Sequence, residues 1–165
     1  MGLLEHGKCE LLDGDIVPKR AIKCNHSLVQ AALFIVLMRL FGQNHVMPPV
    51  SVPIGDDSMP EPDVSVTKKP GGAYVGQDYL QPGDVRVVIE VSDTTIDDDL
   101  TRKAGIYARG GIAEYWVLDV AARRLLIHGS PTATGYTHVM QYDEADTAAP
   151  LALPDATFLV SDLLP

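Results

Sequence analysis

Residues 84–91, DVRVVIEV, restrict the possible folds of this chain more than any other segment. Side chains of a strand alternate between two faces, and both faces of this segment are almost entirely apolar. The pattern predicts a central strand of a sheet that is covered on both sides. Within the apolar run of residues 87–91, Glu90 is the exception, because a buried carboxylate is costly unless it is paired, protonated or bound to a metal. Its presence calls for a functional explanation.

The composition fits one domain over residues 1–165, since 46% hydrophobic residues supply enough apolar surface for a single core. The 13 basic and 22 acidic residues give a net charge of -9. This charge argues against a protein that holds nucleic acid mainly through a broad basic surface, although a local basic groove stays possible.

The expected location is the cytoplasm, without a membrane anchor. Residues 1–14 carry acidic and polar side chains where a secretory signal needs a continuous apolar region. The most apolar stretch, residues 28–42, is interrupted by Gln30 and Arg39 and is shorter than the roughly 20 residues of a membrane span, so it predicts a buried helix. Cys9 and Cys24 are too few for a disulfide framework, and their pairing is undetermined.

The fold class that the pattern predicts is α/β (α+β), a mixed sheet flanked by helices and preceded by a β-hairpin. Asp13-Gly14 predicts a tight type I′ turn. A helix is expected from Asn25, as the N-cap, to Phe41, with Gly42 ending it and the sheet or a second subunit covering it. A second helix is expected over residues 98–111. Strands are expected at residues 49–54, 62–69, 84–91, 113–120, 124–130 and 136–144, with residues 158–164 closing the chain.

Two carboxylates are expected to meet on one face of this sheet. Glu90 shares its face with Val88 and Ser92, near the end of its strand, and Asp63 stands at the start of the preceding strand. Antiparallel neighbours bring these two ends together. Carboxylates a few ångströms apart either share a proton or bind a cation, and oxygen ligands favour Mg²⁺ or Mn²⁺.

A lysine is expected to join them from the following helix. Leu100, Ala104, Tyr107 and Ala108 form one apolar stripe, and Lys103 lies about 40° from Tyr107 at its edge. Its ammonium group would meet the carboxylates, stabilise negative charge on a phosphate, and orient or deprotonate a water.

Several segments of the chain resemble one known family. They are CELLDGDIV, NHSLVQAAL, EPDVSV, residues 87–120 and FLVSDLL. Together they resemble the PD-(D/E)XK nuclease superfamily, and within it the Uma-two branch of restriction endonucleases. The resemblance implies a restriction-endonuclease-like fold, a DNA substrate and a Mg²⁺ or Mn²⁺ cofactor.

The resemblance also implies roles for individual residues. Asp63 corresponds to the Asp of the PD motif and Glu90 to the acidic residue of the (D/E)XK motif, with the Val91 carbonyl as a further metal ligand. Ser92 occupies the third position of that motif, and the lysine looks migrated to Lys103. Glu10 matches an N-terminal acidic residue of the branch, and His26 matches a histidine at its first helix.

Structural interpretations compete with these roles. The role of Asp63 could simply be to cap a strand or a turn, and Glu90 and Lys103 could form a structural ion pair. Acidic residues favour a helix start, so among Asp97 to Asp99 only Asp99 is placed near the site. Tyr107 and Tyr115-Trp116 fit core or interface packing, although a tyrosine hydroxyl could bind a carboxylate. Zinc binding by Cys9, Cys24, His6 and His26 is disfavoured, because their spacing matches no compact ligand pair.

The expected function is Mg²⁺-dependent hydrolysis of DNA phosphodiester bonds by Asp63, Glu90 and Lys103, with Glu10 as a second-metal ligand or water positioner. The rival is a catalytically silent oligomeric scaffold, and a third reading is hydrolysis of a small phosphate ester. A homodimer is expected, because the helix from Leu28 to Leu40 and an exposed Tyr115-Trp116 offer more apolar surface than one sheet covers.

Overall fold

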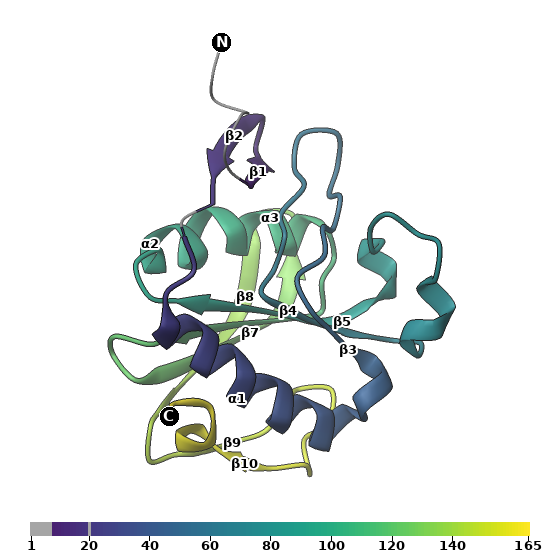
Figure 1. The fold of residues 1–165 in the computed structure, drawn as a ribbon. Helices are drawn as coiled ribbons and strands as arrows, with labels where there is room; N and C mark the ends of the chain where they lie inside the picture. Colours follow the sequence, from purple (N-terminus) through teal and green to yellow (C-terminus); the bar gives the residue numbers. More distant parts are fainter. Residues whose placement is uncertain (1–7, 20) are drawn as a thin grey trace.

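A six-stranded mixed sheet forms the centre of the computed structural model, which describes residues 8–19 and 21–165 (Figure 1). The strand order is β3-β4-β5-β6-β7-β8, and only β5 and β6 run parallel. The strands are β3 (Val46–Met47), β4 (Val64–Thr67), β5 (Val85–Ser92), β6 (Glu114–Asp119), β7 (Arg124–Thr132) and β8 (Gly135–Asp143). The predicted mixed α+β fold is confirmed.

Strand β5 is central and covered on both faces, as its apolar pattern predicts. Val87, Ile89 and Val91 belong to one hydrophobic core with α1 (Cys24–Phe41), whereas Val88 belongs to the other core. That second core includes α3 (Ala104–Arg109), which continues a π turn (Asp99–Lys103) and the short α2 (Ile96–Asp98). Figure 1 shows α1 on one side of the sheet and α2 and α3 on the other.

The predicted N-terminal hairpin is present as β1 (Cys9–Leu12) and β2 (Asp15–Pro18). Asp13 and Gly14 have φ values of 47° and 83°, the two positive values that a type I′ turn requires. The hairpin lies against the loop of residues 55–61, where the Met59 N–H donates to the Leu11 carbonyl at 2.6 Å. The hairpin thereby places Leu12 in the second core and Glu10 beside Lys103.

Helix α1 ends as predicted but begins earlier. Gly42 has φ 89° and its N–H donates to the Met38 carbonyl at 3.0 Å, a C-terminal cap. Asn25 is not the N-cap: the helix begins at Cys24, and Lys23 at the cap position makes no side-chain cap bond. Because Cys24 and Asn25 are exposed, water can satisfy the first N–H groups.

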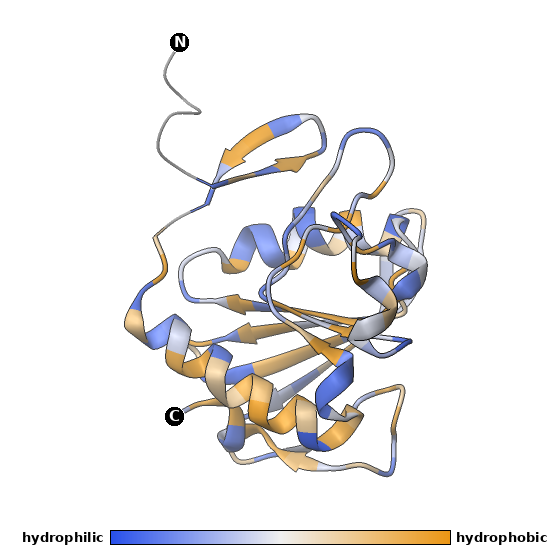
Figure 2. Cartoon of the chain, turned by 45° about the vertical axis from the view of Figure 1, so that its right-hand side comes forward, coloured by the Kyte–Doolittle hydropathy of each residue, from blue (hydrophilic) through white to orange (hydrophobic). Residues whose placement is uncertain are grey.

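The predicted buried helix is only half buried. One side of α1 packs on the sheet, while Leu28, Ile35 and Met38 are 58%, 71% and 38% exposed. Figure 2 shows that α1 is apolar along most of its length. Among the described residues α1 is also the one helix that length and composition alone would allow to span a membrane.

The predicted strand at residues 49–54 is wrong. Pro49 and Pro53 have no N–H, and the Val52 and Ile54 N–H groups donate to the Pro60 and Ser58 carbonyls, so the segment closes a loop on itself. Its alternating pattern reflects burial of Val52 and Ile54 in the second core. The short β3 takes the sheet edge instead.

The C-terminal part forms a small layer beside α1. β9 (Thr147–Ala148) pairs with β10 (Phe158–Leu159), outside the main sheet, and a 3-10 turn follows at Val160–Leu163. Phe158, Val160 and Leu163 join the α1 core, so residues 158–164 close that core rather than extend the sheet.

Candidate active site

Asp63 directly precedes β4 and lies beside the end of β5 that carries Glu90. Val64 pairs with Ile89 in the antiparallel ladder between β4 and β5, so the next position along joins Asp63 to Glu90. The Val91 N–H donates to Asp63 Oδ2 at 2.8 Å, which ties the two segments together. The charge of Asp63 also acts to raise the pKa of Glu90, so the two carboxylates belong to one charged group, and their sharing of one cation stays a prediction.

Lys103 lies at the centre of a buried group of carboxylates. Its Nζ is 3.0 Å from Glu90 Oε1, 3.2 Å from both Glu10 oxygens and 3.9 Å from Asp99 Oδ1. Lys103 is only 7% exposed, and burial opposes its charge. The three carboxylates outweigh that burial and raise the pKa of Lys103, so the ammonium form is strongly favoured.

Glu90 is held by two donors on one oxygen. Lys103 Nζ and the Tyr107 hydroxyl, at 2.7 Å, both donate to Glu90 Oε1. The tyrosine contact is the one that the sequence left open. Burial raises the pKa of Glu90 to about 8, because the favourable charge of Lys103 does not compensate for the loss of water and the neighbouring acids.

Asp63 is fixed from α1 as well as from β5. The His26 Nε2 is 3.2 Å from Asp63 Oδ2, and Gln30 Nε2 donates to the Asp63 carbonyl at 2.8 Å. Burial acts to raise the pKa of Asp63, but the bonds from His26 and Val91 lower it overall. The bond to Asp63 raises the pKa of His26, whose Nδ1 is buried without a partner among the described residues.

Sequence reasoning missed Gln30, which it treated only as an interruption of an apolar run. His26 and Gln30 are four residues apart, so they lie on the same face of α1. That spacing could have indicated that both residues contact one neighbour. The structure gives them a shared one, Asp63.

Ser92 and Asp99 lie at the edge of the group. The Thr95 hydroxyl donates to Asp99 Oδ2 at 2.6 Å, and Ser92 Oγ lies 3.4 Å from that hydroxyl. Burial raises the pKa of Asp99. Asp97 is exposed and Asp98 is only partly buried, so of the three aspartates Asp99 alone is enclosed beside Lys103, as expected.

The structure corrects the expected exposure of Tyr115 and Trp116, and it describes three of the four residues considered for zinc. Tyr115 and Trp116 are fully buried, because both lie in the interior strand β6, so they offer no exposed aromatic surface. Cys9 and Cys24 are free and exposed, while His6 lies outside the described residues.

The carboxylates suit a divalent cation through their unused oxygens. In residues 8–19 and 21–165, no three His, Cys, Asp or Glu side chains are grouped so that they alone could hold a metal. Mg²⁺ needs less, because one or two carboxylates, backbone carbonyls and water satisfy it. Asp63 and Glu90 are each anchored through one oxygen, and the described residues donate no hydrogen bond to Asp63 Oδ1 or Glu90 Oε2. Asp63, Glu90 and the Val91 carbonyl therefore fit as ligands.

Comparison with known proteins identifies a family and a similar fold. The Uma-two family model (Uma2), described as "Putative restriction endonuclease", matches residues 3–161. No curated protein matches.

Among solved structures, the chain is similar to "a putative nuclease belonging to DUF820" from Anabaena variabilis ATCC 29413. The TM-score is 0.66 at 15% identity, and the match covers 94% of this chain and 88% of that chain. At this identity the similarity concerns the fold, and it agrees with the expected restriction-endonuclease-like architecture.

Proposed function

The chain belongs to the Uma2 family, and we propose that it is a Mg²⁺- or Mn²⁺-dependent endonuclease that hydrolyses phosphodiester bonds of DNA. The observation that carries the proposal is the excess of acid around one lysine. Glu10, Asp63, Glu90 and Asp99 are grouped around Lys103, with His26 at their edge. Buried carboxylates in such excess favour a cation, and two of them have an unused oxygen.

In this proposal Asp63, Glu90 and the Val91 carbonyl hold the cation, which supplies Lewis acidity when bound. His26 and Gln30 fix Asp63, and the Tyr107 hydroxyl fixes Glu90. These contacts hold the two carboxylates in place before substrate arrives.

Lys103 acts on the phosphate as a positive charge. Three carboxylates keep it protonated, so it does not take a proton from water as the sequence alone allowed. It stabilises negative charge that builds on the phosphate oxygens, and Glu10 holds it in position. Water attacks phosphorus, the bond to the 3′ oxygen breaks, and the products carry a 5′-phosphate and a 3′-hydroxyl.

Metal titration calorimetry tests the proposal most directly. Mg²⁺ and Mn²⁺ should bind wild type, and Asp63→Asn and Glu90→Gln should each lose that binding together with cleavage of plasmid and single-stranded DNA. Glu114→Gln is the matched control, because it changes another buried carboxylate, one that faces Trp116 and residues 151–152.

Two other functions predict different results. If wild type binds no divalent cation, the structural Glu90–Lys103 ion pair and the net charge of -9 favour the silent scaffold. If it binds metal and hydrolyses bis-p-nitrophenyl phosphate but no DNA, the substrate is a small phosphate ester.

We also propose that the chain works as a cytoplasmic homodimer. The exposed Leu28, Ile35 and Met38 on α1 support association, while the buried Tyr115 and Trp116 no longer do. The free, exposed Cys9 and Cys24 suit a reducing compartment. Light scattering at micromolar concentration checks the dimer, and a monomer there contradicts it.

A further inference from the structure

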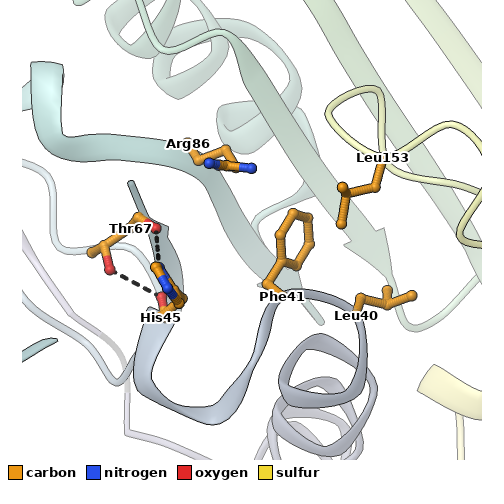
Figure 3. A pocket seen from close by; sticks show the side chains of 6 residues that line it. All are labelled: Leu40, Phe41, His45, Thr67, Arg86 and Leu153. Atoms are coloured by element: carbon orange, nitrogen blue, oxygen red, sulfur yellow. Dashed lines mark hydrogen bonds between the residues drawn. The ribbon is translucent and has the colours of Figure 1, made fainter. Parts of the chain in front are cut away.

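A cavity of about 240 Å³ lies on the α1 side of the sheet, away from the carboxylate group (Figure 3). Its lining comes from the end of α1, the turn after it, β4, β5 and the C-terminal loop. The lining residues are Leu40, Phe41, His45, Thr67, Arg86 and Leu153. Arg86 stands four positions before Glu90 on β5, near the opposite end of that strand. The cavity is thus separate from the candidate active site.

One wall of the cavity is polar and the other apolar. His45 Nδ1 lies 2.9 Å from the Thr67 carbonyl, and the Thr67 hydroxyl donates to the His45 carbonyl at 3.1 Å, which fixes the polar wall. Leu40, Phe41 and Leu153 form the apolar wall. Figure 3 shows the Arg86 side chain extending over the space between these walls.

Arg86 differs from the other arginines of the described chain. Arg39, Arg102, Arg109, Arg123 and Arg124 each pair with a carboxylate. Arg86 is partly buried, yet among residues 8–19 and 21–165 its side chain has no hydrogen bond and no ion pair. A guanidinium group carries five N–H donors, and one that is partly withdrawn from water favours an anionic partner.

The carboxylate of Glu114, which the charge of Arg86 influences, already has other partners. Burial raises the pKa of Glu114, and the charge of Arg86 is among the weaker effects that oppose this rise. The Glu114 oxygens, however, accept bonds from Trp116 Nε1 and from the Leu151 and Ala152 N–H groups. Glu114 therefore ties the C-terminal loop to β6, and Arg86 forms no ion pair with it.

We propose that this cavity binds a small carboxylic acid with a flat apolar body. The carboxylate meets the planar fork of Arg86, which matches it geometrically, and the body packs on Phe41, Leu40 and Leu153. A volume of about 240 Å³ has room for several waters, which suits a single ring with one acid group. The site does not depend on the proposed nuclease activity.

Benzoate is the probe, and its binding to the whole protein is followed by NMR titration. Wild type should bind benzoate saturably, with shifts at Phe41 and Leu153, and should bind benzamide, the neutral analogue, at least about tenfold more weakly. Arg86→Met should weaken benzoate binding by at least about tenfold, because the stem stays and the charge is lost. Arg39→Met is the matched control and should bind benzoate like wild type.

Arg86→Lys keeps the charge but not the fork, so its benzoate affinity should fall between those of wild type and Arg86→Met. This order can be read even if Arg86→Met is destabilised. The proposal is overturned by any of four results: no saturable benzoate binding at about 10 mM, equal binding of benzamide, an equal loss in Arg39→Met, or inorganic phosphate binding as tightly as benzoate. The last result would show that the apolar wall contributes nothing.

Discussion

The two faces of the sheet are packed with different chemistry, although β5 contributes to both. On the α1 face, Leu33 and Leu37 meet Ile89 in a core of apolar side chains. On the opposite face, Lys103 and Tyr107 enclose Glu90, so charged groups lie among Val88 and Tyr115. Alternate side chains of β5 thus face two different environments. The α1 face contributes stability alone, whereas on the opposite face the same residues determine both stability and the proposed chemistry.

Lys103→Met should produce the largest effect, and it acts on the charged face. Losing the ammonium group leaves Glu10 and Glu90 buried without their cation, which should cost about 3 kcal/mol or more of unfolding free energy. DNA cleavage should also fall by at least about a hundredfold. Chemical denaturation and a cleavage assay measure the two effects.

Bound metal separates the two roles of Lys103. Mg²⁺ can partly satisfy Glu90, so it should recover some stability of the variant but not its activity. Full cleavage activity in Lys103→Met would remove Lys103 from the proposed mechanism.

Leu33→Ala should be the next largest effect, and it acts on the apolar face. Leu33 is 0% exposed, and its truncation leaves a cavity that should cost about 2 to 5 kcal/mol. Unlike Lys103→Met, this loss should be equal with and without Mg²⁺, and the Mg²⁺ affinity of the folded protein should not change. A clear change in that affinity would show that the two faces are coupled.

His128 gives the charged face a pH dependence. Burial lowers the pKa of His128 below its usual 6.5, with the Tyr115 carbonyl opposing this through a hydrogen bond. As the pH falls from 6.5 through the lowered pKa of His128, the unfolded chain binds the proton more readily than the folded chain. The stability of the fold therefore decreases over this pH range. The slope is at most about 1.4 kcal/mol per pH unit for this proton.

The measurement is the stability of wild type and His128→Gln between pH 7 and pH 5. The variant should lose less stability over this range than wild type, whereas His138→Gln, at an exposed position of β8, should behave like wild type. The same pH dependence in His128→Gln and wild type would contradict the assignment.

Lys23→Ala should have the smallest effect. The Lys23–Asp93 and Lys103–Glu90 pairs have the same N–O distance, 3.0 Å, but the Lys23 side chain is 65% exposed and the Lys103 side chain is 8% exposed. Solvent screens the first pair, so its loss should change the unfolding free energy by less than about 0.5 kcal/mol. An effect as large as that of Lys103→Met would mean that burial does not explain the difference.

Much of the fold could be predicted because local patterns determine it. Asp13-Gly14 specified the turn, and the two-sided apolar pattern of β5 specified its central place. Residues 49–54 show the limit: Val52 and Ile54 are buried as in a strand, but two prolines and bonds to Ser58 and Pro60 make a loop. Alternation of apolar and polar residues predicts which side chains are buried, but it does not predict which acceptors the backbone N–H groups bind.

The proximity of the candidate site residues could also be predicted, because strand register places Asp63 beside Glu90 and helical periodicity turns Lys103 inward. The sequence did not reveal the clamp of His26 and Gln30 on Asp63, which depends on how α1 crosses β4. The prediction also overestimated the exposure of Tyr115 and Trp116, which are fully buried. Local sequence does not show how many layers of structure cover β6.

The π turn at residues 99–103 lets the helix accommodate a change in its own length. A π turn is an α-helical turn with one inserted residue, so removing the exposed Thr101 would restore regular helical bonding. The wider turn absorbs the inserted residue, so the helix on either side would keep nearly its present orientation. A one-residue deletion in the regular helix α3 would instead rotate its two sides by about 100° relative to each other. When this chain is aligned with homologues, closing a one-residue gap here would equate a buried lysine with a residue of another face.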